Sequence, residues 1–152
     1  MTAELMDTTG TLPGREFAAL YAQAQQFYTH QMRLLDTHDT EQLTSSFTED
    51  AVLELPGSTG PVPVRAQLAR YVRAGAQRQR RAGGRLHHWV GKLDVRPRAD
   101  GSLRTRCSAL AYVTAFDGGA PVLSVCVMED VLVRVGGQWR ITHRRVSRDD
   151  LV

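Results

Sequence analysis

The sequence predicts an α+β domain in which three N-terminal helices pack on a curved antiparallel sheet. Helical patterns fill most of the chain up to residue 82, and four long strand patterns joined by short turns follow from residue 86. Helices first and a strand meander last favour a sheet that wraps around helices. With no internal repeat and no interdomain linker, residues 14–152 are interpreted as one domain. Residues 1–13 are polar, threonine-rich and without periodicity, so we expect a flexible tail there.

Three helices are expected before the main sheet. The first begins at Gly14, and its apolar stripe at ~100° per residue leaves Asp36 at the margin of the stripe, beside the core. Asp39 precedes residues 40–42 in a pattern typical of a capping-box start, which predicts a short second helix. A third helix, about residues 64–82, carries Leu68, Tyr71 and Val72 on its apolar side and ends at Gly83-Gly84. The stripe of the first helix consists of Phe17, Leu20, Tyr21, Ala24, Phe27, Tyr28, Met32, Leu34 and Leu35.

Strand patterns account for the remaining regular structure. One strand covers residues 47–55 and stops at Pro56-Gly57; the meander is expected at 86–97, 103–117, 121–135 and 138–147. A hairpin centred on Gly118-Gly119 would place Cys126 opposite Ala111, roughly 13 Å along the strand from Cys107 at ~3.3 Å per residue. Because disulfide Cα atoms lie within about 7 Å of each other, no disulfide is predicted. Both cysteines are interpreted as small core or sheet residues.

The composition argues against several classes of function. The net charge of +3 and the pI near 9.2 come almost entirely from arginine, and the densest basic run, residues 78–85, has no aromatic residue for base stacking. We interpret this run as a solvated helix end and expect no nucleic-acid partner. No apolar run approaches the roughly 18 residues that span a bilayer, and the N-terminus has no signal pattern, so a cytoplasmic protein without a membrane partner is expected. No phosphate-binding glycine loop, nucleophile elbow or metal-ligand spacing occurs, and we expect no cofactor and no metal.

Glu129 is the polar residue that strand periodicity singles out. It shares one face of its strand with five valines, at positions 125, 127, 131, 133 and 135. A carboxylate on such a face is costly unless it meets a partner or a wet pocket, where desolvation would raise its pKa and suit a general acid or base. The alternative is that this face is the convex one and lies against a partner subunit, with Glu129 at its rim.

Adjacent histidines, His87 and His88, must point to opposite faces of a strand. His87 has the parity of Trp89, Leu93 and Val95, whereas His88 has that of Leu86 and Val90. Periodicity alone therefore slightly favours His87 as the inward residue.

Four segments in this order resemble the SnoaL-like branch of the NTF2-like superfamily, which includes polyketide cyclases and scytalone dehydratase. They are LLDTHD at 34–39, SSFTEDAVLEL at 45–55, HHWVG at 87–91 and VGGQWRITHRRV at 135–146. The resemblance spans roughly residues 15–148. It implies a cone-shaped α+β fold with a pocket between the helices and the concave face of the sheet, and a homodimer through the outer face.

The resemblance also assigns residues. It favours His88, since the family's catalytic histidine lies four residues before an asparagine; that later position holds Lys92 here. Asp36 matches the helix-end aspartate that works with this histidine, although a solvated helix-end carboxylate is the alternative for Asp36. Leu35 replaces the tyrosine of scytalone dehydratase, so that particular activity is not expected. Arg144 matches an arginine used mostly in a structural ion pair. The residues expected to line the pocket are Tyr28, His87, Trp89, Tyr112 and His143, with a core tyrosine as the alternative for Tyr28.

The function that the resemblance implies is cofactor-independent acid–base chemistry on a small, apolar, oxygen-bearing substrate. Dehydration, isomerisation or ring closure of a polyketide-type intermediate would use His88, oriented by Asp36, to move the proton, while Glu129 or Tyr112 polarises an oxygen. Epoxide opening by the same carboxylates is a related alternative. A non-catalytic ligand-binding or assembly subunit is the alternative from another class, and large side chains would then fill the cone.

Overall fold

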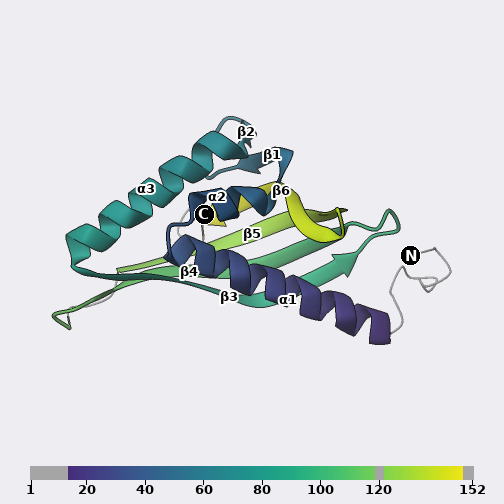
Figure 1. The fold of residues 1–152 in the computed structure, drawn as a ribbon, viewed down its shortest axis with the longest axis horizontal. Coiled ribbons are helices and arrows are strands. Elements are labelled where there is room, and N and C mark those ends of the chain that lie inside the picture. Colours follow the sequence, from purple (N-terminus) through teal and green to yellow (C-terminus); the bar gives the residue numbers. More distant parts are fainter. Residues whose placement is uncertain (1–13, 119–121, 149–152) are drawn as a thin grey trace.

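The computed structural model describes residues 14–118 and 122–148, so the predicted tail at residues 1–13 lies outside the described residues. Three helices lie over one face of a six-stranded sheet (Figure 1), as the sequence predicts. The predicted meander strands correspond to β3–β6, with ends that differ by at most two residues. The elements are α1 (Gly14–Asp36), α2 (Thr40–Ser45), β1 (Phe47–Glu54), β2 (Val62–Pro63), α3 (Val64–Ala82), β3 (Gly84–Pro97), β4 (Leu103–Ala115), β5 (Val122–Val135) and β6 (Gln138–Arg148).

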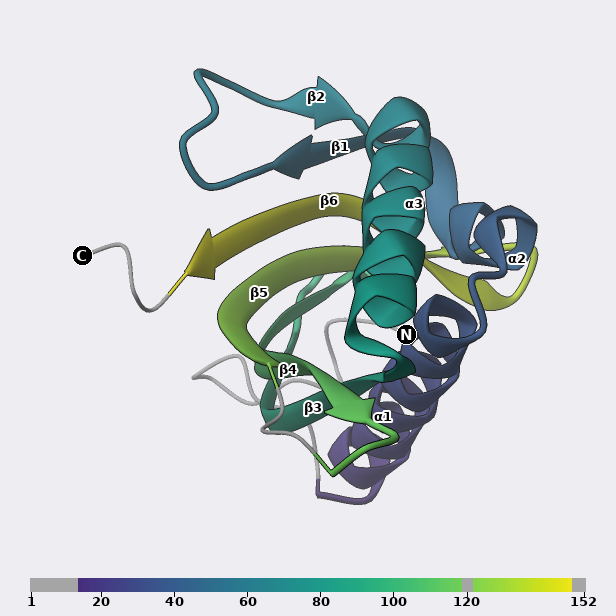
Figure 2. The same cartoon turned by 90° about the vertical axis from the view of Figure 1, so that its left-hand side faces the viewer.

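The sheet has the strand order β2-β1-β6-β5-β4-β3 and is curved but not closed (Figure 2). The predicted curved antiparallel sheet is confirmed for all neighbours except β1 and β6, which pair in parallel. The reason is topological: α3 carries the chain from the β1/β2 end of the sheet to the opposite edge at β3. The meander then returns strand by strand and brings β6 beside β1.

Helix ends follow from local chemistry. The backbone N–H of Gln42 donates to Oδ1 of Asp39 at 3.1 Å, which confirms Asp39 as the N-cap of α2. Gly83 ends α3 at φ 57°, in the left-handed region that glycine adopts without a steric penalty. Among the described residues, no helix is both long and apolar enough to cross a membrane.

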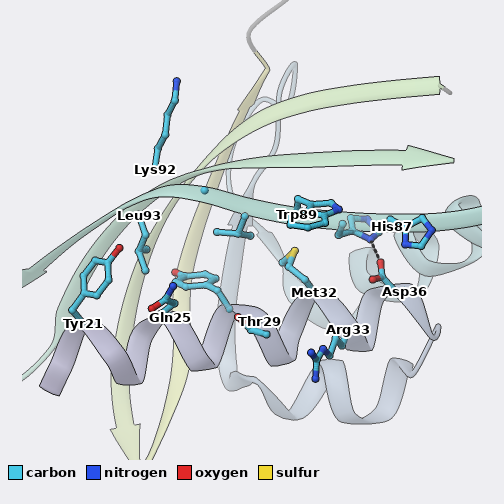
Figure 3. Close-up of a pocket in the computed structure, with 14 residues that line it drawn as sticks. Tyr21, Gln25, Thr29, Met32, Arg33, Asp36, His87, Trp89, Lys92 and Leu93 are labelled. Atoms are coloured by element: carbon cyan, nitrogen blue, oxygen red, sulfur yellow. Dashed lines mark hydrogen bonds and ion pairs between the residues drawn. The ribbon is translucent and has the colours of Figure 1, made fainter. Parts of the chain in front are cut away.

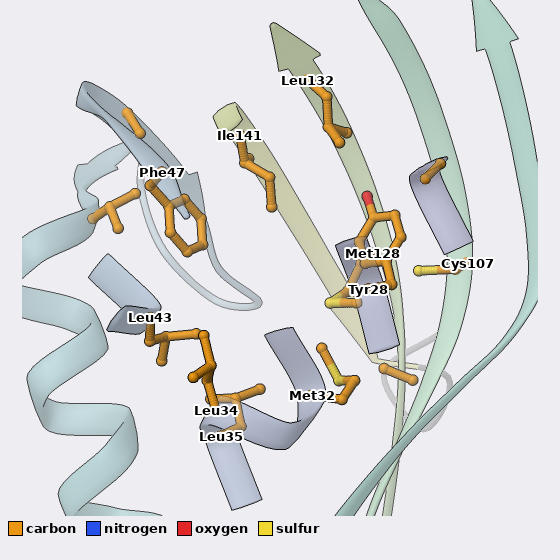
Figure 4. Close-up of a cluster of buried hydrophobic side chains, with 14 of the residues drawn as sticks. Tyr28, Met32, Leu34, Leu35, Leu43, Phe47, Cys107, Met128, Leu132 and Ile141 are labelled. Carbon is orange, nitrogen blue, oxygen red and sulfur yellow. The ribbon is translucent and has the colours of Figure 1, made fainter. Parts of the chain in front are cut away.

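The core lies between the helices and the concave face of the sheet (Figure 4). It combines the apolar stripe of α1 with inward side chains from every long strand, and its most deeply buried side chains include Tyr28, Leu43, Leu103, Leu132 and Ile141. No disulfide joins Cys107 and Cys126, as the sequence predicts. Their strand register differs from the prediction by two residues, since Cys126 pairs with Ala109 and Cys107 with Met128. Burial raises the pKa of the Cys107 thiol to about 12.

A buried polar network crosses this core at Asp130. Its carboxylate accepts hydrogen bonds from Nε and Nη2 of Arg144, both at 2.8 Å, and from the Tyr28 hydroxyl at 2.5 Å. Arg144 also donates to Oε1 of Gln31 at 2.7 Å, and the Tyr28 hydroxyl contacts Oγ1 of Thr105 at 2.6 Å. Arg144 is therefore in a structural ion pair. Tyr28 is a core tyrosine, the alternative that the sequence left open, and it also borders the cavity along α1, as the prediction of a lining residue requires.

Candidate functional site

Asp36 is fixed by the way α1 ends. Leu34 and Leu35 bury their side chains, and the chain then turns at His38, whose φ of 59° lies in the left-handed region. This turn lets the N–H of Asp39 donate to the carbonyl of Leu34 at 3.0 Å and closes the helix. Asp36 thus occupies the last helical position, with its side chain 26% exposed, at the margin of the core as expected.

His88, not His87, faces the helices. Along β3, Leu86 and His88 are buried and pair with Val113 and Ala111 of β4. The alternation of inward and outward side chains along β3 shifts by one residue at a β-bulge, because Gly91 pairs with Ser108 but Asp94 pairs with Arg106. Within the bulge, Lys92 has a φ of 53°. Val95 is therefore buried on the same face as His88, although the two residues differ in parity.

Three side chains form a hydrogen-bonded chain at His88. Its Nδ1 lies 2.8 Å from Oδ1 of Asp36 (Figure 3), and its Nε2 lies 3.2 Å from the hydroxyl of Tyr71 on α3. Because a carboxylate can only accept, Nδ1 carries the proton in this contact and Nε2 presents its lone pair. The arrangement fixes both the tautomer and the ring plane of His88.

The electrostatics favour a neutral imidazole. The His88 side chain is 4% exposed, and this loss of solvent lowers the pKa of His88 below its usual value, against the opposing effect of Asp36. The positive charge of Arg78 acts in the same direction as burial. Tyr71 is 43% exposed, yet its hydroxyl end is withdrawn from water, and this burial raises the pKa of Tyr71. A neutral base and a neutral phenol thus lie next to each other.

Two cavities approach this chain of residues. The larger, about 510 Å³, follows α1 along the edge strand β3, from Tyr21 and Leu93 to Asp36 and His88 (Figure 3). The smaller, about 310 Å³, lies between the end of α3 and strands β3–β5. Its wall includes Ala111, the cross-strand neighbour of His88. Within residues 14–118 and 122–148, no three His, Cys, Asp or Glu side chains gather as a potential metal site.

Glu129 and three of the predicted lining residues lie on the outer face of the sheet. The Glu129 side chain is 42% exposed and pairs with Arg106 at 3.7 Å. Tyr112 stacks on His87 with ring centroids 5.1 Å apart and accepts a hydrogen bond from Nε1 of Trp89 at 2.8 Å. His87 and Trp89 nevertheless border the larger cavity, as predicted. Glu129 is therefore not placed to polarise an oxygen held by His88. Tyr112 makes its side-chain contacts on the outer face, although it also borders the smaller cavity.

His143 also lies on the outer face, where its Nε2 is 2.9 Å from Oε2 of Glu54. The predicted common face with Trp139 and Ile141 was wrong because β6 contains a bulge. Leu132 pairs with Ile141, but Val131 pairs with His143, which leaves Thr142 without a counterpart. The extra residue turns His143 outward and the next residue, Arg144, into the core.

Three residues near His88 were not proposed as site residues from the sequence. Tyr71 was assigned to the apolar side of α3, and Arg78 to a solvated helix end, although Nε of Arg78 is inaccessible to solvent and has no protein partner. Nothing in the sequence singled out His38. The one available signal was spacing: Tyr71 and Arg78 lie seven residues apart, and thus on one face of a helix.

Comparison with known families identifies the fold. Residues 16–145 match the family described as the SnoaL-like domain, and the chain therefore belongs to this family. The match spans most of the described chain, from α1 to β6. A comparison with functionally curated proteins finds no match.

Solved structures agree with this assignment. Aln2 from a Streptomyces species is 32% identical, with a TM-score of 0.79 over 93% of this chain and 96% of Aln2. ActVI-ORFA from Streptomyces coelicolor is 28% identical, with a TM-score of 0.74 over 88% of this chain and 99% of the other. A protein from Catenulispora acidiphila in complex with S-DNPA is 29% identical, with a TM-score of 0.70 over 88% of this chain and 96% of that one.

Proposed function

We propose that this protein is a cofactor-independent enzyme that transfers a proton on a small, apolar, oxygen-bearing molecule of the polyketide type. The reaction would be dehydration, isomerisation or ring closure. The observation that carries the proposal is the chain Asp36–His88–Tyr71, in which a neutral imidazole is held between a carboxylate and a phenol.

Asp36 has two tasks in this proposal. Its contact with Nδ1 holds His88 in the tautomer whose Nε2 can accept a proton. Once Nε2 is protonated, the carboxylate lies 2.8 Å from the imidazolium that has formed. The C-terminal end of α1 is negative as well, and this also stabilises the imidazolium. A carboxylate at the negative end of a helix is destabilising in the resting protein, but both negative charges stabilise the imidazolium once it forms.

The proposed dehydration proceeds in two proton transfers. Nε2 of His88 takes the proton from a carbon next to a carbonyl group, while the Tyr71 hydroxyl donates a hydrogen bond to the carbonyl oxygen. The imidazolium then gives its proton to the hydroxyl group on the next carbon. The C–O bond breaks, water leaves, and the electron pair of the former C–H bond becomes the new C=C bond. Isomerisation would return the proton to a different carbon. General acid–base groups of this kind contribute typically ~10²–10⁴-fold.

Two observations support an enzyme over an assembly subunit. Asp36 and His88 line a cavity of about 510 Å³, whereas an adaptor would have this volume filled by side chains. In addition, the Catenulispora acidiphila protein, which is 29% identical, has been crystallised with S-DNPA.

The test measures loss of water from the aldol adduct of benzaldehyde and acetone, whose product is a conjugated enone with a strong ultraviolet absorption. Asp36→Asn and His88→Ala should each lower turnover by at least ~10²-fold. His30→Ala is the matched control, because His30 is exposed on α1 and lies outside the chain of hydrogen bonds. Melting temperatures should stay close to that of the parent. Near-full activity in both site variants would contradict the proposal.

A further inference from the structure

Arg78 lies at the wall of the smaller cavity in an unusual state for an arginine. Its Nε is inaccessible to solvent and has no hydrogen-bond partner. No ion pair among the described residues involves Arg78 or its neighbour one turn later, Arg81. A buried N–H on a charged group without an acceptor is destabilising, so this position is costly for the empty protein.

The two carboxylates bonded to His88 and Arg144 are already committed to these partners. Asp36 accepts from His88, and Asp130 accepts from Arg144 and Tyr28. The cavity wall itself contains no Asp or Glu among the described residues; it consists of Arg78, Arg81 and Ala82 of α3 with Leu86, Ala111, Tyr112, Val113 and Ser124 of the sheet. The cavity is therefore mainly apolar on the sheet side, with hydroxyl groups only at Tyr112 and Ser124, and cationic on the helix side.

Arg78 is close enough to the proposed reacting groups for its charge to act on both. It lowers the pKa of His88, in the same direction as the larger effect of burial. It also opposes the rise in the pKa of Tyr71 that burial causes. An anion bound at Arg78 would thus lie within electrostatic reach of His88 and Tyr71.

We propose that Arg78, assisted by Arg81, forms an anion subsite, and that the substrate of the proposed reaction carries a carboxylate that binds there. An arginine fork matches a carboxylate in a bidentate geometry, and Nε is one of the two donors of that fork. A carboxylate at Arg78 supplies the acceptor that Nε lacks. The carbon skeleton of the ligand then lies along Leu86 and Ala111, and Ala111 is the cross-strand neighbour of His88.

The anion subsite rests on the proposed function, because it concerns the substrate of the same reaction. Its test measures binding alone, so the subsite and the reaction can be refuted independently. Naphthoate and the neutral naphthamide have nearly the same shape and differ in charge, and both serve as probes in isothermal titration calorimetry. The parent protein should bind naphthoate at least ~10-fold more tightly than naphthamide, the size expected for a charge-assisted hydrogen bond. Amide signals of Leu86 and Ala111 should shift in NMR spectra upon addition of naphthoate.

Arg78→Met should remove this preference and leave the affinity for naphthamide unchanged, and Arg78→Lys should keep part of it. Arg80→Met is the matched control: it removes the same charge from the same helical turn, but at an exposed position outside the cavity wall, and should bind both probes as the parent does. The proposal is overturned if the parent binds the two probes equally or binds neither at millimolar concentration. The proposal is also overturned if Arg80→Met weakens the binding of naphthoate as much as Arg78→Met does. If Arg78→Met does not fold, two other results decide. A reduced preference for naphthoate in Arg78→Lys and shifted Leu86 and Ala111 signals in the parent support the proposal, and the absence of both overturns it.

Discussion

Removing the Asp130 carboxylate should lower the free energy of unfolding more than most other single substitutions in this protein. Its side chain is 0% exposed and accepts three hydrogen bonds, two from Arg144 and one from Tyr28. In Asp130→Ala the Arg144 guanidinium, 8% exposed, would keep its charge in the core without a counterion. Breaking a buried pair in this way costs about 3–5 kcal/mol. Native domains are stable by only about 5–15 kcal/mol, so the loss is a large fraction of the total.

The measurement is urea unfolding followed by far-ultraviolet circular dichroism, with the melting temperature as a second readout. For a chain of this length the expected fall in melting temperature is roughly 6–20 °C. Glu129→Ala is the matched control, because it removes the adjacent carboxylate of the same strand from an exposed ion pair. Surface pairs contribute about 0–1 kcal/mol, and this variant should unfold nearly as the parent does.

A double variant separates the cost of an orphaned charge from the value of the pair. Asp130→Leu combined with Arg144→Met replaces both charges by apolar groups of similar size. It should be much more stable than Asp130→Ala, because replacing a whole buried pair is often neutral. The reasoning would be refuted if Asp130→Ala lost less than about 1 kcal/mol or if the double variant were no more stable than Asp130→Ala.

The further predictions concern three single residues, His88, Lys92 and Cys107. Turnover should fall as the pH drops through the lowered pKa of His88, because protonated Nε2 cannot accept a proton; the midpoint should lie below about 6.5, and a midpoint above it would contradict the assignment. Stability should decline in the same window, since the unfolded histidine is protonated first as the pH falls, and His88→Phe should remove that contribution. Lys92→Asn should raise the melting temperature by roughly 2–4 °C, because asparagine tolerates the φ of 53° better than lysine; a lower melting temperature would argue against strain at this bulge. Cys107, 1% exposed and with a raised pKa, should not react with Ellman's reagent in the folded protein, and mass spectrometry of the labelled chain checks this.

The sequence predicts the order and bounds of the elements well because these depend on local signals. The apolar stripe of α1, the cap at Asp39 and the glycine at position 83 each act within a few residues of the place they specify. The parallel pairing of β1 with β6 depends instead on which edge of the sheet each strand joins, and no local pattern encodes that.

The facing of the strand residues was the weakest part of the sequence-based reasoning, and the two bulges explain why. In β3, Leu93 and Val95 lie beyond the bulge at Lys92, so their parity says nothing about His87. With those two residues set aside, Leu86 and Val90 alone would have pointed to His88. The family resemblance favoured His88 because it compares positions and does not assume a regular alternation.

The bulge in β6 has the larger consequence for the site. Without this bulge, strict alternation from Ile141 through Thr142 would turn His143 into the core and leave Arg144 on the outer face. Asp130 would then be the orphaned charge, and Gln31 and Tyr28 would lose their link through the Arg144–Asp130 pair. Since Gln31 and Tyr28 both belong to α1, this pair anchors the helix whose last residue is Asp36. The position of the Asp36 carboxylate against His88 therefore depends on a one-residue irregularity in the last strand of the sheet.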